Sequence, residues 1–184
     1  MGTLNVASLN STSLNSTNLT STGGNINIDG TWTGAPVGTI IGTAYGSSTT
    51  TVSVGAIRTY VEIANLTYTT KAANSIFFLT GYTHCYGSGG SYTSSSRANI
   101  GFEVVSGGVT TRITGIDGAS GDSWGTQSYP GCILARHEQY TSSFAAGTAC
   151  TFKLLGASYD LSAAKFNTSG YNHKCVLTLF EIAT

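Results

Sequence analysis

Charged side chains are scarce in this sequence: they make up 9% of its 184 residues, as eight basic and eight acidic side chains. This sparse and balanced charge leaves no basic patch to hold nucleic acid by counterion release, and no polybasic segment to bind a membrane surface. Hydrophobic residues still make up 40%, so the low charge does not indicate a disordered chain. Solubility then depends on hydroxyl and amide groups, which favours a protein that is held in an assembly.

Long apolar runs are also absent. None is longer than the run at residues 76–79, which is far too short to span a bilayer, and we therefore predict no membrane insertion. Residues 1–14 lack a basic region followed by an apolar stretch, so we expect no signal peptide and synthesis in a cytoplasm. Cysteines are more often reduced than bridged in that compartment. The sequence leaves the disulfide state open for four of them: Cys85, Cys132, Cys150 and Cys175.

Motifs for catalysis or metal binding are missing or poorly placed. No GxSxG motif is present, and the histidines have no nucleophile at a known catalytic spacing. His84 and Cys85, together with His173 and Cys175, invite a zinc interpretation. Adjacent residues of a strand point to opposite faces, however, so His84 and Cys85 do not reach one ion without a bend. We predict no enzyme activity, no catalytic residue, no metal site and no cofactor.

The N-terminal segment contains an internal repeat. A leucine recurs every five residues, and an offset of five gives a leucine stripe neither on a flat strand nor on an α-helix. Three interpretations remain open: a coil that resembles the pentapeptide-repeat pattern, three chains that wind around a shared axis, and a disordered tail. We assign residues 1–30 to a stem or anchor and residues 31–48 to a glycine-rich neck. The repeated leucines are Leu4, Leu9, Leu14 and Leu19.

The remainder of the chain shows strands and turns, without a long amphipathic helical pattern. Residues 98–105 and 109–116, joined across Ser-Gly-Gly, predict a β-hairpin. The pattern predicts an all-β, jelly-roll-like antiparallel β-sandwich, here called the knob, over residues 49–184. The other predicted strands are 50–54, 57–63, 75–83, 128–136, 150–155 and 174–183.

The C-terminal run is the most informative of these strands, because both of its faces are largely apolar. One face carries Cys175, Leu177, Leu179 and Glu181, and the other carries Val176, Thr178, Phe180 and Ile182. A sandwich interior covers one face; we expect a second copy of the chain to cover the other, and the alternative cover is loops of the same chain. The residues expected in the core and in contacts between copies are Phe77, Leu177, Leu179 and Phe180.

Three stretches together resemble a known family. They are Gly-Gly-Asn-Ile-Asn-Ile-Asp at residues 23–29, Asn-Ser-Ile-Phe-Phe-Leu at 74–79 and Leu-Thr-Leu-Phe-Glu-Ile-Ala at 177–183. The chain resembles small fibre and appendage proteins of tailed bacteriophages, particularly those of marine and cyanobacterial hosts. Their C-terminal domains are similar in layout to the trimeric tumour-necrosis-factor-like jelly roll. The resemblance implies a homotrimeric virion protein whose partners are its own copies and other proteins of the tail, baseplate or capsid.

The expected function is attachment to the host surface, with the knob touching glycans through loop aromatics. The alternative function is a capsid decoration protein that stabilises the head and recognises nothing on the host. The same aromatics can instead pack at the sandwich rim and between copies. The candidate receptor-facing residues are Tyr86, Tyr92, Trp124 and Tyr129.

Overall fold

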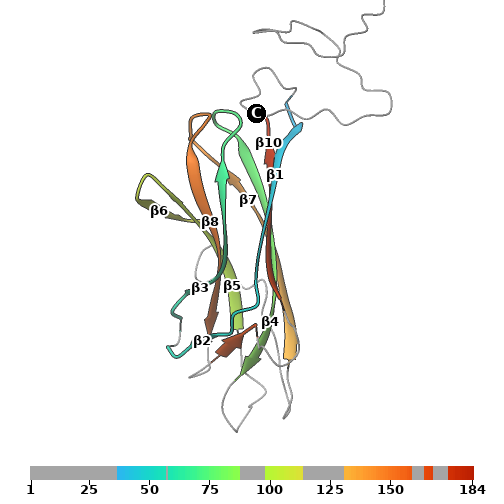
Figure 1. Ribbon diagram of the computed structural model, residues 1–184, viewed down its shortest axis with the longest axis vertical. Helices are drawn as coiled ribbons and strands as arrows, with labels where there is room; N and C mark the ends of the chain where they lie inside the picture. The colour runs from blue at the N-terminus through green and yellow to red at the C-terminus, as the bar shows by residue number, and fades with distance from the viewer. Residues whose placement is uncertain (1–36, 57, 88–97, 114–130, 159–163, 168–173) are drawn as a thin grey trace, which may run out of the picture.

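A computed structural model describes residues 37–56, 58–87, 98–113, 131–158, 164–167 and 174–184. The described residues form ten β-strands and no helix, arranged as two antiparallel sheets that face each other (Figure 1). The six-stranded sheet contains β1 (Ile40–Ser48), β10 (Cys175–Ile182), β4 (Ile76–Gly87), β7 (Gly131–Thr141), β9 (Ala164–Phe166) and β2 (Val52–Val54). The four-stranded sheet contains β3 (Val61–Thr69), β8 (Ala149–Ser158), β5 (Ala98–Ser106) and β6 (Val109–Arg112). The prediction of an all-β antiparallel sandwich is confirmed.

The strand pairs are nested around one hairpin. β5 pairs with β6, β4 with β7, β3 with β8, and β1 with β10, so each pair encloses the one before it along the chain. Successive pairs alternate between the two sheets. β10 then joins the outermost pair to β4 in the six-stranded sheet, and β8 joins β3 to β5 in the four-stranded sheet. The chain thus follows a folded double ribbon, and six of the nine connections between consecutive described strands cross from one sheet to the other.

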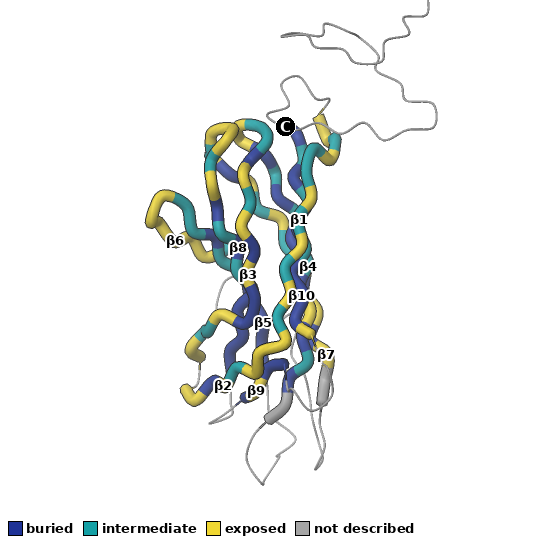
Figure 2. The backbone as a smooth tube through the Cα atoms, in the orientation of Figure 1, coloured by how far each residue is buried: buried dark blue, intermediate teal, exposed yellow. Residues whose placement is uncertain are grey.

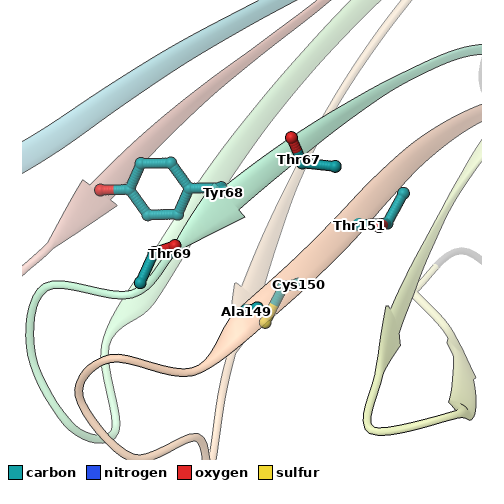
Figure 3. Close-up of a pocket in the computed structure, with 6 residues that line it drawn as sticks. All are labelled: Thr67, Tyr68, Thr69, Ala149, Cys150 and Thr151. Atoms are coloured by element: carbon teal, nitrogen blue, oxygen red, sulfur yellow. The ribbon is translucent and has the colours of Figure 1, made fainter.

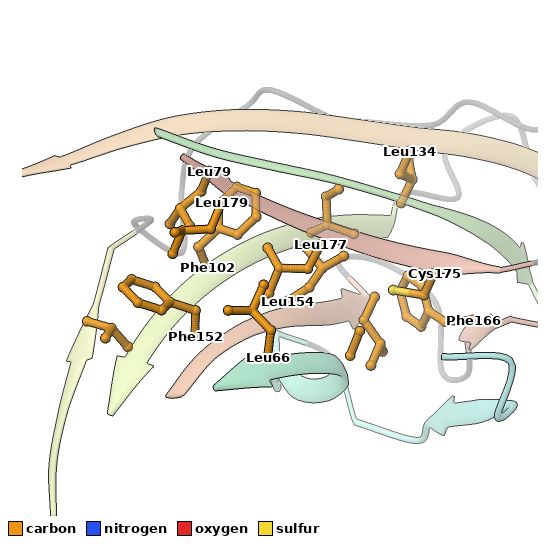
Figure 4. Close-up of a cluster of buried hydrophobic side chains, with 14 of the residues drawn as sticks. Leu66, Leu79, Phe102, Leu134, Phe152, Leu154, Phe166, Cys175, Leu177 and Leu179 are labelled. Carbon is orange, nitrogen blue, oxygen red and sulfur yellow. The ribbon is translucent and has the colours of Figure 1, made fainter. Parts of the chain in front are cut away.

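The hydrophobic core fills the space between the sheets, and β10 crosses its centre (Figure 4). Leu177 and Leu179 are fully buried there, with Phe77 of the neighbouring β4, and all three have 0% exposure. The Phe77 ring packs on Phe152 of the opposite sheet at 5.0 Å between centroids. These three predicted residues therefore belong to the interior of a single copy. Phe180 points the other way, because successive residues of a strand alternate in face.

Glu181 is the one acidic residue on the inward face of β10, and it is fully buried. Its carboxylate accepts hydrogen bonds from the Tyr68 hydroxyl at 2.6 Å and the Ser75 hydroxyl at 2.6 Å. The backbone N–H groups of Lys71 and Ala72 donate to it at 2.9 and 3.1 Å. Burial raises the pKa of Tyr68 above its ordinary value, and the hydrogen bond to Glu181 and the charge of that carboxylate raise it further. The phenol therefore stays protonated and remains a donor. A buried carboxylate with several donors fastens the end of β10 to the turn that precedes β4.

The glycine-rich neck predicted over residues 31–48 is wrong for residues 40–48, which form strand β1. The sandwich therefore begins at residue 40 instead of 49. The glycines that suggested a linker are needed for close packing. A Cβ at Gly46 would overlap the backbone carbonyl of Asn65, and one at Gly42 would overlap the Tyr68 hydroxyl. β1 lies so close to β3 that larger residues do not fit at these two positions.

Several predicted strands differ from the observed ones at their ends. The hairpin over 98–116 is confirmed, although β6 ends at Arg112. The strand predicted over 57–63 is observed as β3, residues 61–69. Ile63 lies at a register shift between Glu62 and Ala64, and beyond it Ala64 and Leu66 alternate inward and continue the strand. Short β9 was not predicted at all. It extends the position of β10 beside β4 and is followed by Asn167, whose positive φ of 56° ends the strand.

Candidate functional site: the uncharged face of the six-stranded sheet

The outward side of β1, β10, β4 and β7 carries no Lys, Arg, Asp or Glu among the described side chains. Here this surface is called the uncharged face. Its residues follow from the register of the three strand pairs, since directly opposed residues point to the same side of a sheet. They are Ile40, Thr43, Tyr45 and Ser47 from β1; Val176, Thr178, Phe180 and Ile182 from β10; Ile76, Phe78, Thr80, Tyr82 and His84 from β4; and Ile133, Ala135, His137, Gln139 and Thr141 from β7.

Apolar side chains gather on the two central strands of this face. Phe180 lies directly opposite Phe78, and Ile182 directly opposite Ile76. All four are only partly buried in a single copy, although each sits in the middle of a sheet. The His137 ring stacks on Phe78 with 6.0 Å between centroids and 28° between planes. The centre of the face is therefore an aromatic and aliphatic cluster that nothing in the described residues covers.

Large apolar side chains at the margins of the face are more exposed. Ile40 and Tyr45 on edge strand β1 are 55% and 62% exposed, and Ile133 on edge strand β7 is 64% exposed. Tyr82 on β4 is 43% exposed. Figure 2 shows exposed and partly buried residues along β1 and β7. Apolar exposure that continues across four strands marks an interaction surface more often than scattered single residues do.

The outward side of the four-stranded sheet is chemically different. One charged residue from each strand forms a row of alternating sign across it. Lys153 lies 3.2 Å from Glu62 and 3.7 Å from Glu103, and Arg112 lies 3.4 Å from the other oxygen of Glu103. The Arg112 guanidinium also lies 4.7 Å from the centre of the Tyr60 ring. Such partly exposed ion pairs are typical of a face that stays in water.

A small open pocket of about 200 Å³ lies where β3 meets β8 (Figure 3). Its lining is made of hydroxyl and small side chains: Thr67, Tyr68, Thr69, Ala149, Cys150 and Thr151. The Tyr68 hydroxyl is already engaged by Glu181, and burial raises the pKa of the Cys150 thiol above its ordinary value. The pocket is smaller than most small-molecule sites and offers neither a charged group nor a reactive thiolate.

The residues weighed for zinc lie apart. His84 is on the uncharged face, whereas Cys85 is buried in the core at 2% exposure, as the alternation of a strand requires. Burial raises the pKa of Cys175 to about 12, so this thiol is protonated at neutral pH. Within the described ranges, no group of three or more His, Cys, Asp or Glu side chains is arranged to hold a metal ion. His173 lies outside the described residues.

Most of the other predicted site residues also lie outside the described residues. These are the leucines Leu4, Leu9, Leu14 and Leu19 and the aromatics Tyr92, Trp124 and Tyr129. Tyr86 belongs to β4 by its backbone, and its side chain is outside the described part. Of the residues expected in contacts between copies, Phe180 alone is on the uncharged face. The sequence did not single out Phe78, His137, Ile133 and Tyr45, although the lack of charged residues at every second position of β1, β4 and β7 was visible in it.

No family model matches the chain, and no curated protein matches it. The described residues contain no helix with the length and apolar character needed to cross a membrane.

Proposed function

We propose that this chain is a non-enzymatic structural protein of a phage virion, a homotrimeric fibre whose knob attaches to the host surface. The observation that carries the proposal is the uncharged face. A sheet face with partly buried phenylalanine, exposed isoleucine and tyrosine, and no ionic group among its described side chains is suited to burial against another protein surface.

The strand order supports a jelly roll. In that architecture an antiparallel ribbon folds over so that its strands are divided between two sheets. The nested pairs from β5·β6 outward to β1·β10 have this arrangement, with four strand positions on each side. β2 and β9 extend the outermost pair at one end. A trimeric jelly roll is the fold that the resemblance to phage appendage proteins implies.

A second copy of the chain is the best-matched partner for the uncharged face. Because the face holds no ionic group, two copies of it approach without charge repulsion, and a charged partner would lose its hydration there without compensation. Four strands about 4.8 Å apart and about nine residues long cover about 600 Å². That area approaches the roughly 800 Å² that each partner buries in a standard interface. The copy number of three rests on the family resemblance and on the leucine repeat.

The two ends of the sandwich differ in a way that suits attachment. The described chain enters beside its own C-terminus, where the N–H of Gly38 donates to the Ala183 carbonyl at 2.9 Å. At the opposite end lie the paired residues that flank the Ser-, Gly- and Tyr-rich segments, including Tyr86 with Gly131 and Ala98 with Ser158. We propose that residues 1–30 join the virion at the first end and that the segments flanked by these paired residues, 88–97 and 114–130, contact host glycans. Polar, tyrosine-containing loops on a rigid β-scaffold are common in recognition.

Two measurements on the full chain test the proposal. Sedimentation equilibrium at micromolar concentration should give three times the chain mass of 18.9 kDa. The purified trimer should then compete with phage particles for adsorption to host cells. A single subunit in sedimentation would overturn the assembly. If a trimer leaves adsorption unchanged, and virions that lack the protein infect normally but break under osmotic or thermal stress, the attachment role is wrong and capsid decoration takes its place.

A further inference from the structure

We infer that protonation of His137 weakens the association of copies through the uncharged face, which makes the assembly sensitive to mild acid. This inference rests on the proposed function, since it concerns the regulation of the same surface. Histidine is the side chain that changes its charge between about pH 5 and pH 8.

His137 lies midway along edge strand β7, beside the apolar cluster at the centre of the face. It lies directly opposite Thr80 on β4. Its ring stacks on the ring of Phe78, two residues before Thr80 on the same strand, with 6.0 Å between the ring centroids. Phe78 in turn lies opposite Phe180 on β10. The His137 side chain is exposed in a single copy, so a proton on it is hydrated there. A copy that covers Phe78 and Phe180 also removes water from the imidazole.

Among the described residues of this face, no acidic group compensates a charged imidazole. The titratable side chains that the four strands direct outward are Tyr45, Tyr82, His84 and His137, and none of them is an acid that is ionised at neutral pH. On its own strand, the neighbouring Glu138 points to the other side of the sheet and pairs with Arg136 at 2.7 Å. The remaining charged residues of the outward side, Lys165 of β9 and exposed Lys174 before β10, are positive. A protonated His137 therefore gains no ion pair when the face is covered.

The direction of the effect follows from proton linkage. The covered face favours neutral imidazole, so the assembled state binds fewer protons than the separate copies. Association must then strengthen as the pH rises and weaken as it falls. A homotrimer contributes three His137 side chains, so the effect is repeated in every copy.

The test is the pH dependence of the association constant of the full chain, measured by sedimentation at about pH 8 and about pH 5. We expect the dissociation constant to rise by at least about tenfold in acid. In the His137→Gln variant, the dissociation constants at the two pH values should be nearly equal, whatever the absolute affinity of the variant. His84→Gln, the matched change of the other histidine on the face, should keep the rise in acid. Circular dichroism at both pH values checks that each subunit remains folded.

The outcomes separate the inference from the proposed function. A single subunit at about pH 8 overturns the proposed assembly and the inference with it. An assembly equally strong at both pH values overturns the inference alone. A pH effect that survives His137→Gln, or that disappears in His84→Gln, overturns the assignment to His137.

Discussion

The outward sides of the two sheets are built on the same backbone pattern but carry opposite chemistry. The four-stranded sheet presents Glu62, Lys153, Glu103 and Arg112 in one ion-paired row. The six-stranded sheet presents phenylalanine, isoleucine, tyrosine, threonine and histidine, with no ionic residue from β1, β10, β4 or β7 among the described side chains. In a chain with so few charges, this unequal distribution supports our proposal that the four-stranded side faces water and the six-stranded side meets another copy.

The largest expected effect comes from a charge placed inside the sandwich instead of on either outward side. Leu179→Asp puts a carboxylate at a position with 0% exposure and removes a core side chain. We expect the free energy of unfolding to fall by more than about 4 kcal/mol, with loss of the folded state or aggregation. Urea unfolding followed by circular dichroism measures this change. A soluble variant with native stability would contradict the placement of β10 in the core.

The next largest effect is expected from a charge on the other side of the same strand, β10. Phe180→Asp changes the adjacent residue, which points to the uncharged face opposite Phe78. We expect a folded subunit whose association is weakened by at least about 100-fold, or about 2.7 kcal/mol, because the carboxylates lose hydration without a partner. Sedimentation measures the association, and circular dichroism measures the fold.

Val105→Asp is the matched control for that change. Val105 is also a partly buried apolar residue, but it points outward from the four-stranded sheet beside Thr151. We expect this variant to associate normally. Equal weakening by Phe180→Asp and Val105→Asp would remove the distinction between the two sides.

The smallest effect concerns the charged row itself. Glu103→Gln removes the acidic partner of both Arg112 and Lys153. Because these pairs are partly exposed, the free energy of unfolding should fall by less than about 1 kcal/mol, and high salt should reduce the difference further. Association should not change. Unfolding curves at low and high salt check the first statement, and sedimentation checks the second. Dissociation of the variant would show that the four-stranded sheet, and not the uncharged face, holds the interface.

Local pattern was sufficient wherever a strand alternates strongly or a turn is specific. The β5–β6 hairpin was predicted from Ser-Gly-Gly between two strand-like runs, and β10 from a β-branched and aromatic run without Gly or Pro. β1 was missed because its glycines resemble a linker until β3 is known to lie against them. β9 is three residues long, too short for any periodic signal. Glu181 was assigned correctly to the face of Leu177 and Leu179. Its hydrogen-bond donors were not predicted, because they lie about 110 positions earlier in the chain.

The amino-acid sequence by itself determined an all-β chain with little charge and a closing strand that is apolar on both sides, because side-chain alternation and turn chemistry are local properties. Only the tertiary structure decided which strands share a sheet, since that depends on pairing between residues far apart in the chain. It also decided that Leu179 fills the core while Phe180 joins Phe78 and His137 on the outward side. The uncharged face exists only when β1, β10, β4 and β7 lie side by side, and no single one of these strands contains it.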